Sequence, residues 1–110
     1  MLAYMCRDRT KGPLMSLEYT VHKMTQDTAA LYGLTDRGVI APGYRADLNL
    51  IDFDQLALTD PEIVYDLPAG GRRLTQNATG YLATICAGEV TFENGTHTGA
   101  MPGRLIRGGA

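Results

Sequence analysis

The sequence has few of the residues from which enzymes build a reactive site. Its 110 residues include no tryptophan, two cysteines, two histidines and a single serine. A metal centre needs several histidine, cysteine or carboxylate ligands brought together, whereas His22 and His97 stand in neither an H-x-H nor an H-E-x-x-H arrangement. We therefore interpret both as surface or satisfied core residues. We expect no metal ligand, catalytic residue or cofactor-binding residue in this chain.

Long apolar runs and long basic runs are also missing. Charges interrupt the opening "MLAYMCRDR" too early for the apolar core of a signal peptide or for a membrane span. The net charge is −2, and no run of lysine or arginine is interleaved with aromatic residues, as nucleic-acid binders require. We expect a cytoplasmic protein that binds neither membranes nor nucleic acids. Cys6 and Cys86 form no C-x-x-C motif and are expected to be free thiols.

The potential nucleophiles each have a simpler structural interpretation. Ser16 precedes a segment of helical periodicity and is expected to cap that helix, and the chain has no G-x-S-x-G motif. Cys86 follows Ile85 in an apolar strand, which predicts a buried and unreactive thiol. Cys6 has Arg7 beside it, but its place on an apolar helix face outweighs this weak sign of activation.

Two charged clusters are candidates for a binding site or an acid–base site. The stretch "AGGRR", residues 69–73, could hold an anion on backbone N–H groups, with Arg72 and Arg73 adding charge. A Gly-Gly turn with two solvated arginines is the simpler alternative. Asp47 and Asp52 are separated by an odd number of residues, so on a regular strand they point to opposite faces and form no carboxylate pair. We expect Asp47 to cap or bond nearby backbone.

The first third of the chain predicts helices. Ser16 is a suitable N-cap, and Glu18 lies in the first turn, where a negative charge is favourable. A break near Thr25 is expected, and Gly33 suits the left-handed position that ends a helix at about Tyr32. Apolar residues follow at steps of three and four, which predicts one buried stripe: Leu17, Val21, Met24 and Leu31.

After Gly33 the apolar period changes from 3.6 to 2, which indicates strands. Residues 53–76 have weak periodicity and predict a long excursion with at most short elements. We therefore expect an α+β fold, in which N-terminal helices precede a small, mainly antiparallel sheet. The predicted elements are a strand, a type II turn at Pro42-Gly43 and a second strand within Arg37–Asp52, strands over Tyr81–Ala87 and Glu89–Phe92, and a type I′ turn at Asn94-Gly95.

The segment "TQDTAALYGLTDRGVIAPGYRADLNLIDFD", Thr25 to Asp54, resembles the closing segment of the amidohydrolase superfamily. In that family a threonine, an alanine and a Gly-Leu pair precede a glycine-rich turn and an Ala-Asp strand. The matching positions are Thr25, Ala29, Gly33-Leu34, Gly38, Gly43 and Ala46-Asp47. The stretches "YDLPAGGRRL" (65–74) and "ATICAGEVTFENGTHTGAMPGRLIRG" (83–108) resemble the C-terminus of the D-aminoacylase, or N-acyl-D-amino-acid deacylase, branch. The opening "RDRTKGPLMSLEYTVHKMT" is similar to the same branch after its last barrel strand.

This resemblance implies an architecture in which the reactive centre lies elsewhere. Such enzymes are TIM barrels that carry zinc, with a small β-sandwich built from both chain ends, and the metal activates the water that attacks an amide carbonyl. Residues 1–34 would be the helical end of the barrel, and residues 35–110 the C-terminal segment of the sandwich. The family's zinc ligands and catalytic carboxylate map onto no position here. Zinc is therefore expected for the full-length enzyme and not for this chain.

Three functions remain open from the sequence. The favoured one is a C-terminal fragment of a zinc-dependent deacylase, structural and inactive alone, because the first helix begins without a capping residue. The alternatives are an autonomous β-rich interaction module and an enzyme with an unrecognised site around Arg72, Arg73 and His97. A fragment would lack the barrel and the N-terminal strands of its parent. We therefore expect homo-oligomers, such as a dimer with exchanged strands or helix, to cover the exposed apolar surface.

Overall fold

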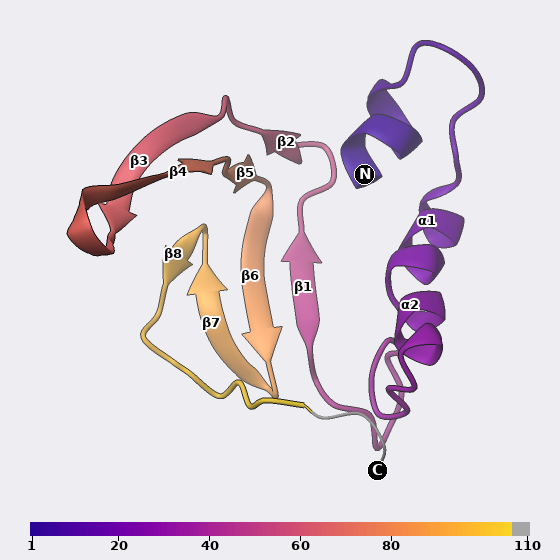
Figure 1. Cartoon of the computed structure of the whole chain (residues 1–110). Coiled ribbons are helices and arrows are strands. Elements are labelled where there is room, and N and C mark those ends of the chain that lie inside the picture. The colour runs from indigo at the N-terminus through magenta and orange to yellow at the C-terminus, as the bar shows by residue number, and fades with distance from the viewer. Residues whose placement is uncertain (107–110) are drawn as a thin grey trace.

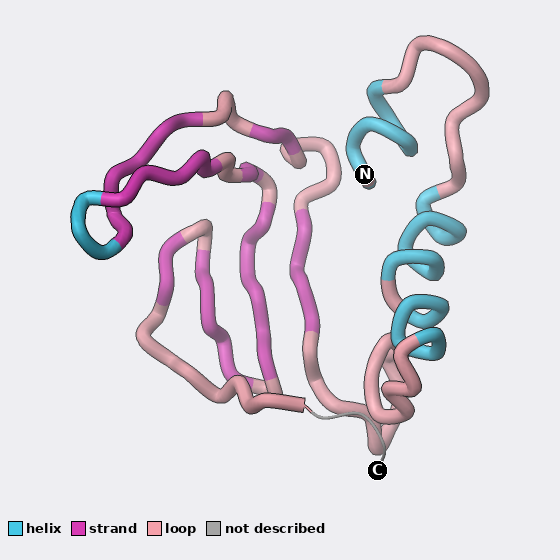
Figure 2. The backbone as a smooth tube through the Cα atoms, in the orientation of Figure 1, coloured by secondary structure: helices cyan, strands magenta, loops and turns pink. Residues whose placement is uncertain are grey.

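The computed structural model describes residues 1–106 and confirms the α+β class (Figure 1). Helices come first along the chain and antiparallel strands follow, as the secondary-structure colours of Figure 2 show. Within the described residues, none of the helices combines the length and hydropathy that crossing a membrane requires. The elements are η1 (Tyr4–Asp8), α1 (Leu17–Met24), α2 (Gln26–Leu31), β1 (Leu48–Ile51), β2 (Ala57–Leu58), β3 (Glu62–Leu67), η2 (Pro68–Gly70), β4 (Gly71–Thr75), β5 (Ala78–Thr79), β6 (Tyr81–Cys86), β7 (Glu89–Glu93) and β8 (Thr96–His97).

The helical part follows its sequence signals closely. The side chain of Ser16 accepts a hydrogen bond from the backbone N–H of Tyr19 at 3.2 Å, which makes Ser16 the predicted N-cap of α1. The expected break occurs at Thr25, whose φ of −118° and ψ of −83° are not helical. Gly33 has a φ of +68°, and the N–H of Leu34 returns to the carbonyl of Ala29 at 2.9 Å, which ends α2.

The main sheet has the strand order β1-β6-β7-β8, and all of its pairs are antiparallel. Its two tight turns have the positive φ angles that hairpins favour. These are +52° and +84° at Ala87-Gly88, and +47° and +80° at Asn94-Gly95, which confirms the predicted meander.

Two strand predictions were wrong. The stretch before Pro42 is not a strand, because the 36–47 loop folds on itself through the N–H of Arg45, which donates to the Asp36 carbonyl at 2.7 Å. The segment predicted as a long excursion with at most short elements contains the short strands β3 and β4, which pair as a hairpin that was not predicted. The prolines at 61 and 68 that weakened its periodicity stand just outside β3, where they cost no ladder hydrogen bond.

The protein has very little core. Only Thr20, Ala29 and Leu56 are buried among the described residues. The accessible surface is 8493 Å² for 11.9 kDa, whereas a compact monomer of this mass exposes roughly 6,000 Å². The radius of gyration of 16.4 Å likewise exceeds the roughly 13 Å expected for a compact domain of this length. The chain is therefore an open assembly of layers.

The stripe predicted to be buried on the helices is exposed. Leu17, Val21 and Met24 are 38–45% exposed and Leu31 is 81% exposed. The spacing of the stripe is correct, but extensive contacts between elements join only neighbouring strands, α1 with α2, and β3 with η2. Within residues 1–106, η1 covers this helix face only in part, at the buried Thr20, and leaves the apolar stripe more than a third exposed.

Candidate functional site

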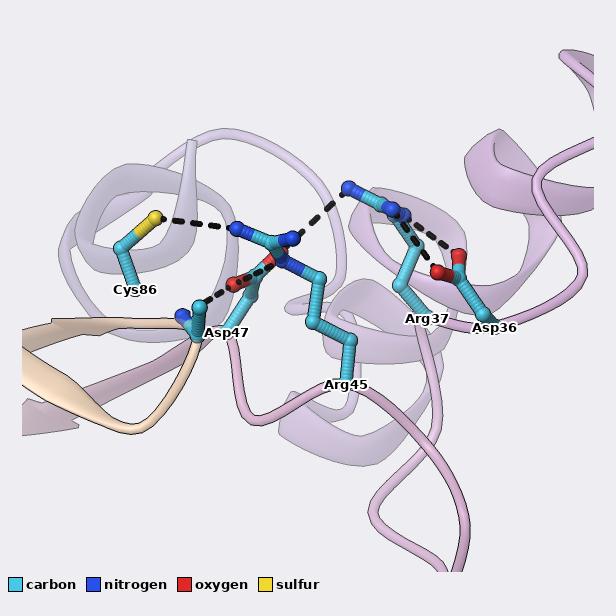
Figure 3. Close-up of polar contacts among 6 residues, drawn as sticks. Asp36, Arg37, Arg45, Asp47 and Cys86 are labelled. Carbon is cyan, nitrogen blue, oxygen red and sulfur yellow. Dashed lines mark hydrogen bonds and ion pairs between the residues drawn. The ribbon is translucent and has the colours of Figure 1, made fainter. Parts of the chain in front are cut away.

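The carboxylate of Asp47, just before β1, accepts hydrogen bonds from several parts of the chain (Figure 3). The Arg45 Nε donates to both carboxylate oxygens, at 2.8 and 2.9 Å. The backbone N–H of Ala87, in the turn between β6 and β7, donates to Oδ1 at 2.8 Å. Arg37 approaches Oδ2 at 3.4 Å and is itself held by Asp36 at 2.8 and 3.0 Å. Asp47 therefore joins the 36–47 loop to the sheet.

These donors determine the charge state of the cluster. Partial burial acts to raise the pKa of Asp47, but the N–H of Ala87 and the guanidinium of Arg45 outweigh it and hold the pKa below its ordinary value. The hydrogen bond from Arg37 likewise lowers the pKa of Asp36. A carboxylate that is ionised and surrounded by fixed donors is a poor general base. Its geometry supports a structural role. Asp47 does bond backbone, but the prediction of a nearby partner was wrong, because the N–H that it accepts from belongs to Ala87, far along the chain.

The two thiols lie in more polar surroundings than their sequence neighbours indicate. Cys86 is only half-buried, where a buried thiol was predicted, and its Sγ lies 3.5 Å from the Nη2 of Arg45. Cys6 donates to the hydroxyl of Thr20 at 3.2 Å, where it packs η1 against α1. Both cysteines are free thiols, as expected.

A second polar centre joins the helices to the sheet. The guanidinium of Arg7, on η1, donates to the backbone carbonyls of Asp54 at 2.9 Å and of Leu56 at 2.6 Å, and also to that of Phe53. The same group lies 5.5 Å from the centre of the Phe53 ring and pairs with Asp8 at 2.7 Å. One side chain therefore satisfies three carbonyls of the turn that follows β1.

Three of the remaining sequence candidates, His22, His97 and Arg73, each have a local partner. His22 pairs with Asp27 at 3.1 Å on the helix surface. His97 packs edge-on against the ring of Phe92, with 5.0 Å between centroids, and accepts from a backbone N–H. Arg73 pairs with Asp66 at 2.6 Å across the β3–β4 hairpin. Across residues 1–106, no three histidine, cysteine, aspartate or glutamate side chains come close enough together to hold a metal ion.

Asp52 behaves as an ordinary turn residue. Its Oδ1 accepts from the backbone N–H groups of Asp54 and Gln55 at 3.1 and 3.2 Å. These donors differ from those of Asp47, so the two carboxylates serve separate parts of the backbone.

Sequence reasoning missed the three arginines that organise these contacts. The Arg45-x-Asp47 spacing places two opposite charges on one side of an extended chain, which is a usable signal. Arg7 gives no such signal, because its partners are backbone carbonyls. Arg37 next to Asp36 is visible in the sequence, but its approach to Asp47 depends on how the loop folds.

Comparison with known proteins gives a consistent set of relatives. The sequence model described as "Amidohydrolase family" matches residues 3–92. An N-acyl-D-aspartate deacylase of Alcaligenes xylosoxydans xylosoxydans is 55% identical over 47 residues, which is 43% of this chain and 9% of that protein. A D-aminoacylase of the same organism is 33% identical over 93 residues, 84% of this chain and 17% of that protein. A dihydroorotase of Elusimicrobium minutum is 29% identical over 87 residues, which is 78% of this chain and 20% of that protein. No solved structure matches.

Proposed function

Because this chain belongs to the amidohydrolase family, we propose that it is the C-terminal supporting segment of a zinc-dependent hydrolase resembling the D-aminoacylases. The chain spans between 9% and 20% of the length of the three relatives described above. In this proposal the segment closes the barrel of the parent enzyme with its helices and completes a small β-sandwich with its strands. It performs no chemistry alone, and hydrolysis of the amide bond belongs to the whole enzyme.

The observation that carries this proposal is the exposed apolar surface. The accessible surface of 8493 Å² exceeds that of a compact monomer of this mass by roughly 2,500 Å². Permanent interfaces bury 2,000–5,000 Å² over both partners, and they resemble a domain core cut in half. The surplus on this one chain is therefore of the size that a permanent partner would cover.

The helix face is the surface that we assign to the barrel. Leu17, Val21 and Met24 lie at steps of four and three along α1 and form one stripe that is more than a third exposed. Figure 1 shows α1 and α2 at one side of the molecule, beyond β1. A stripe of this kind on a well-capped helix is typical of a helix packed against another structural layer.

Residues 1–106 do not fit a zinc ion. The oxygens of Asp47 accept from Arg45 and Ala87, and His22 and His97 each have local partners. Zinc requires about four ligands converging on one point, and residues 1–106 offer no such group. We therefore assign the zinc, and the water that it activates, to the remainder of the parent enzyme.

A split-enzyme complementation experiment tests the proposal. The D-aminoacylase of Alcaligenes xylosoxydans xylosoxydans is prepared without the C-terminal region that aligns with this chain, and the chain is then added in trans with zinc and N-acyl-D-amino acids. We expect no turnover from the chain alone, little from the truncated enzyme, and recovery when the two are mixed. The variant Val21→Asp places a charge on the helix stripe and should abolish recovery, whereas the exposed change Glu18→Gln should preserve it.

Two outcomes would contradict the proposal. Turnover by the purified chain that disappears in Arg72→Ala or His97→Ala variants would support an enzyme with its own site. Failure of the chain to restore or bind the truncated relative, while remaining folded and monomeric, would favour an autonomous interaction module.

A further inference from the structure

The turn between β7 and β8 consists of Asn94 and Gly95 alone. Their φ angles are +47° and +80°, and the pairing of Glu93 with Thr96 closes the turn. Asn-Gly is a preferred sequence for a two-residue hairpin loop of this kind. Both residues are exposed, and nothing lies within 4 Å of a Cβ built on Gly95. The side chain of Asn94 and the backbone of Gly95 are therefore open to water.

An asparagine that precedes a glycine is chemically labile when the backbone can move. The backbone nitrogen of the following residue attacks the Cγ of the asparagine side chain and closes a cyclic imide. A side chain on the following residue hinders this attack, whereas glycine has no Cβ and adapts its backbone most readily. Asparagine is also among the residues that heat-stable proteins use less because of their lability. An exposed Asn-Gly pair is therefore a favourable place for this reaction.

The strand that follows the turn is held by few contacts. β8 has two residues and lies at the edge of the main sheet, at the end opposite β1 (Figure 1). Its ladder to β7 consists of the pairs Phe92–His97 and Glu93–Thr96. The N–H of Asn94 donates to the Leu82 carbonyl on β6 at 2.9 Å, so the turn is anchored on its β7 side. Local opening can therefore release β8 and free the backbone of the turn without global unfolding.

We propose that Asn94-Gly95 is a site of spontaneous modification, at which the amide of Asn94 is replaced by a carboxylate. In the opened turn, the nitrogen of Gly95 loses its proton to solvent and bonds to the Cγ of Asn94, and the side-chain nitrogen leaves as ammonia. Water then opens the imide at either of its two carbonyl groups. The products are aspartate and isoaspartate, in which the main chain runs through the former side chain. The reaction needs water and neither an oxidant nor a reductant.

The modification uncouples β8 from the sheet. Isoaspartate lengthens the backbone of a two-residue turn, and loop length fixes the register of a hairpin. Both products also place a negative charge next to Glu93. Thr98 depends on this register, because its N–H donates to the Thr91 carbonyl at 3.0 Å and its hydroxyl donates to the Val90 carbonyl at 2.7 Å. These contacts are lost together with the ladder.

Two other asparagines provide controls within the same molecule. Asn49 precedes a leucine and Asn77 precedes an alanine, and both are exposed, as Asn94 is. The Oδ1 of Asn49 accepts from the hydroxyl of Thr84 at 2.9 Å. The backbone N–H of Asn77 donates to the hydroxyl of Thr59 at 3.1 Å. Because each has local contacts and is followed by a residue with a side chain, each should keep its amide.

Peptide mapping by mass spectrometry tests the proposal on the whole folded chain, incubated in mildly alkaline buffer and sampled over weeks. We expect progressive conversion of Asn94, with an isoaspartate peptide that elutes separately, while Asn49 and Asn77 remain amides. The rate should rise with pH, because the attacking nitrogen must lose its proton. Asn94→Gly is the matched variant, since Gly-Gly also suits a two-residue turn and has no amide to lose. It should yield no isoaspartate.

Hydrogen exchange on the incubated protein tests the structural consequence. The amide of Thr98 should exchange faster after conversion of Asn94, whereas the amides of β6 should be unchanged. The Asn94→Gly variant, carried through the same incubation, should keep Thr98 protected. The proposal goes beyond the proposed function and is independent of it, because it concerns the β7–β8 turn and is tested without a parent enzyme.

Three results would overturn the proposal. Asn94 keeps its amide in the folded chain over a time in which the urea-unfolded chain loses it, which would mean that the turn protects it. Asn49 and Asn77 are converted as fast as Asn94, which would mean that the turn is no special site. Conversion of Asn94 leaves the exchange of Thr98 unchanged, which would refute the uncoupling of β8.

Discussion

The sheet corner around Asp47 and the helical segment are held to the molecule in different ways. At the sheet corner, one carboxylate receives hydrogen bonds from Arg45, from the Ala87 turn and from the Arg37 side chain, and adjacent strands supply paired backbone. The helical segment shares no such ladder. Arg7 reaches the turn after β1, while the apolar stripe of α1 remains exposed.

This difference indicates which part of the fold is held together by contacts within the chain. Hydrogen bonds and turn geometry are satisfied within the chain, so the sheet corner needs nothing further. Apolar burial is the main favourable term in folding, and it is incomplete in both regions: Leu82, Val90 and Phe92 of the sheet are each 42% exposed. The sheet has ladders and turns that hold it together in addition, whereas the helical segment has no ladder and depends more on a partner.

The largest loss of stability is expected from a substitution in the sheet, which is held by its own turns and ladders. Gly80 has a φ of +86°, and a Cβ there would lie 2.7 Å from backbone atoms of the buried Leu56. Gly80→Ala should destabilise the sheet by about 3 kcal/mol, because backbone must shift and the left-handed conformation is strained. The measurement is the midpoint of urea unfolding.

Gly43 provides the matched control for this change. It has the same φ of +86°, but nothing lies within 4 Å of a Cβ built there. Gly43→Ala should therefore cost only the conformational strain, about 1 kcal/mol. Equal losses in the two variants would show that the contact with Leu56 contributes nothing.

A smaller loss of stability is expected when the pH is lowered far enough to protonate Asp47 at the sheet corner. The pKa of Asp47 lies below its ordinary value of 3.8 in the folded protein, so the unfolded chain binds the proton more readily. The stabilisation is fully present above that ordinary value and is lost as the pH falls through the lowered folded pKa. Because the side chain is partly exposed and screened, the loss should be on the order of 1 kcal/mol.

The variant Asp47→Asn isolates this contribution. Other carboxylates with lowered pKa values, among them Asp36 and Asp66, add their own acid dependence. The test is therefore the difference between the two proteins in unfolding midpoint as a function of pH. A constant difference from neutral pH down to strongly acidic solution would mean that Asp47 gains nothing from its ionised state.

Much of this architecture could be predicted from local signals in the sequence. The N-cap at Ser16, the break at Thr25 and the hairpin turn at Asn94-Gly95 depend on the preferences of single residues or pairs. Those preferences act within one turn of chain, so the structure contains each as expected. The amidohydrolase resemblance depends on the order of such signals, and the family match confirms it.

The predictions that were wrong have one cause in common. Each depended on which other segment lies next to the one considered, and local sequence does not reveal that. The period of Leu17, Val21 and Met24 gives a helix face, but it does not determine whether anything covers that face. The loop before Pro42 was predicted as a strand because alternation alone does not reveal the hydrogen bond from Arg45 to the Asp36 carbonyl. The carbonyl partners of Arg7 carry no side-chain signal at all.

The smallest loss of overall stability is expected from Arg7→Ala. This variant compares the helical segment with the sheet most directly. Its guanidinium satisfies the carbonyls of Phe53, Asp54 and Leu56. Its removal should loosen the attachment of η1 and α1 while the strand ladders remain intact. Hydrogen exchange should therefore accelerate several-fold at amides of residues 4–31 and stay unchanged in β6 and β7, because local opening can occur without global unfolding. Arg9→Ala is the control, since Arg9 bonds only the nearby carbonyl of Lys11. Uniform acceleration across helices and strands would mean that the two regions unfold as one unit and that the helical segment is as self-sufficient as the sheet.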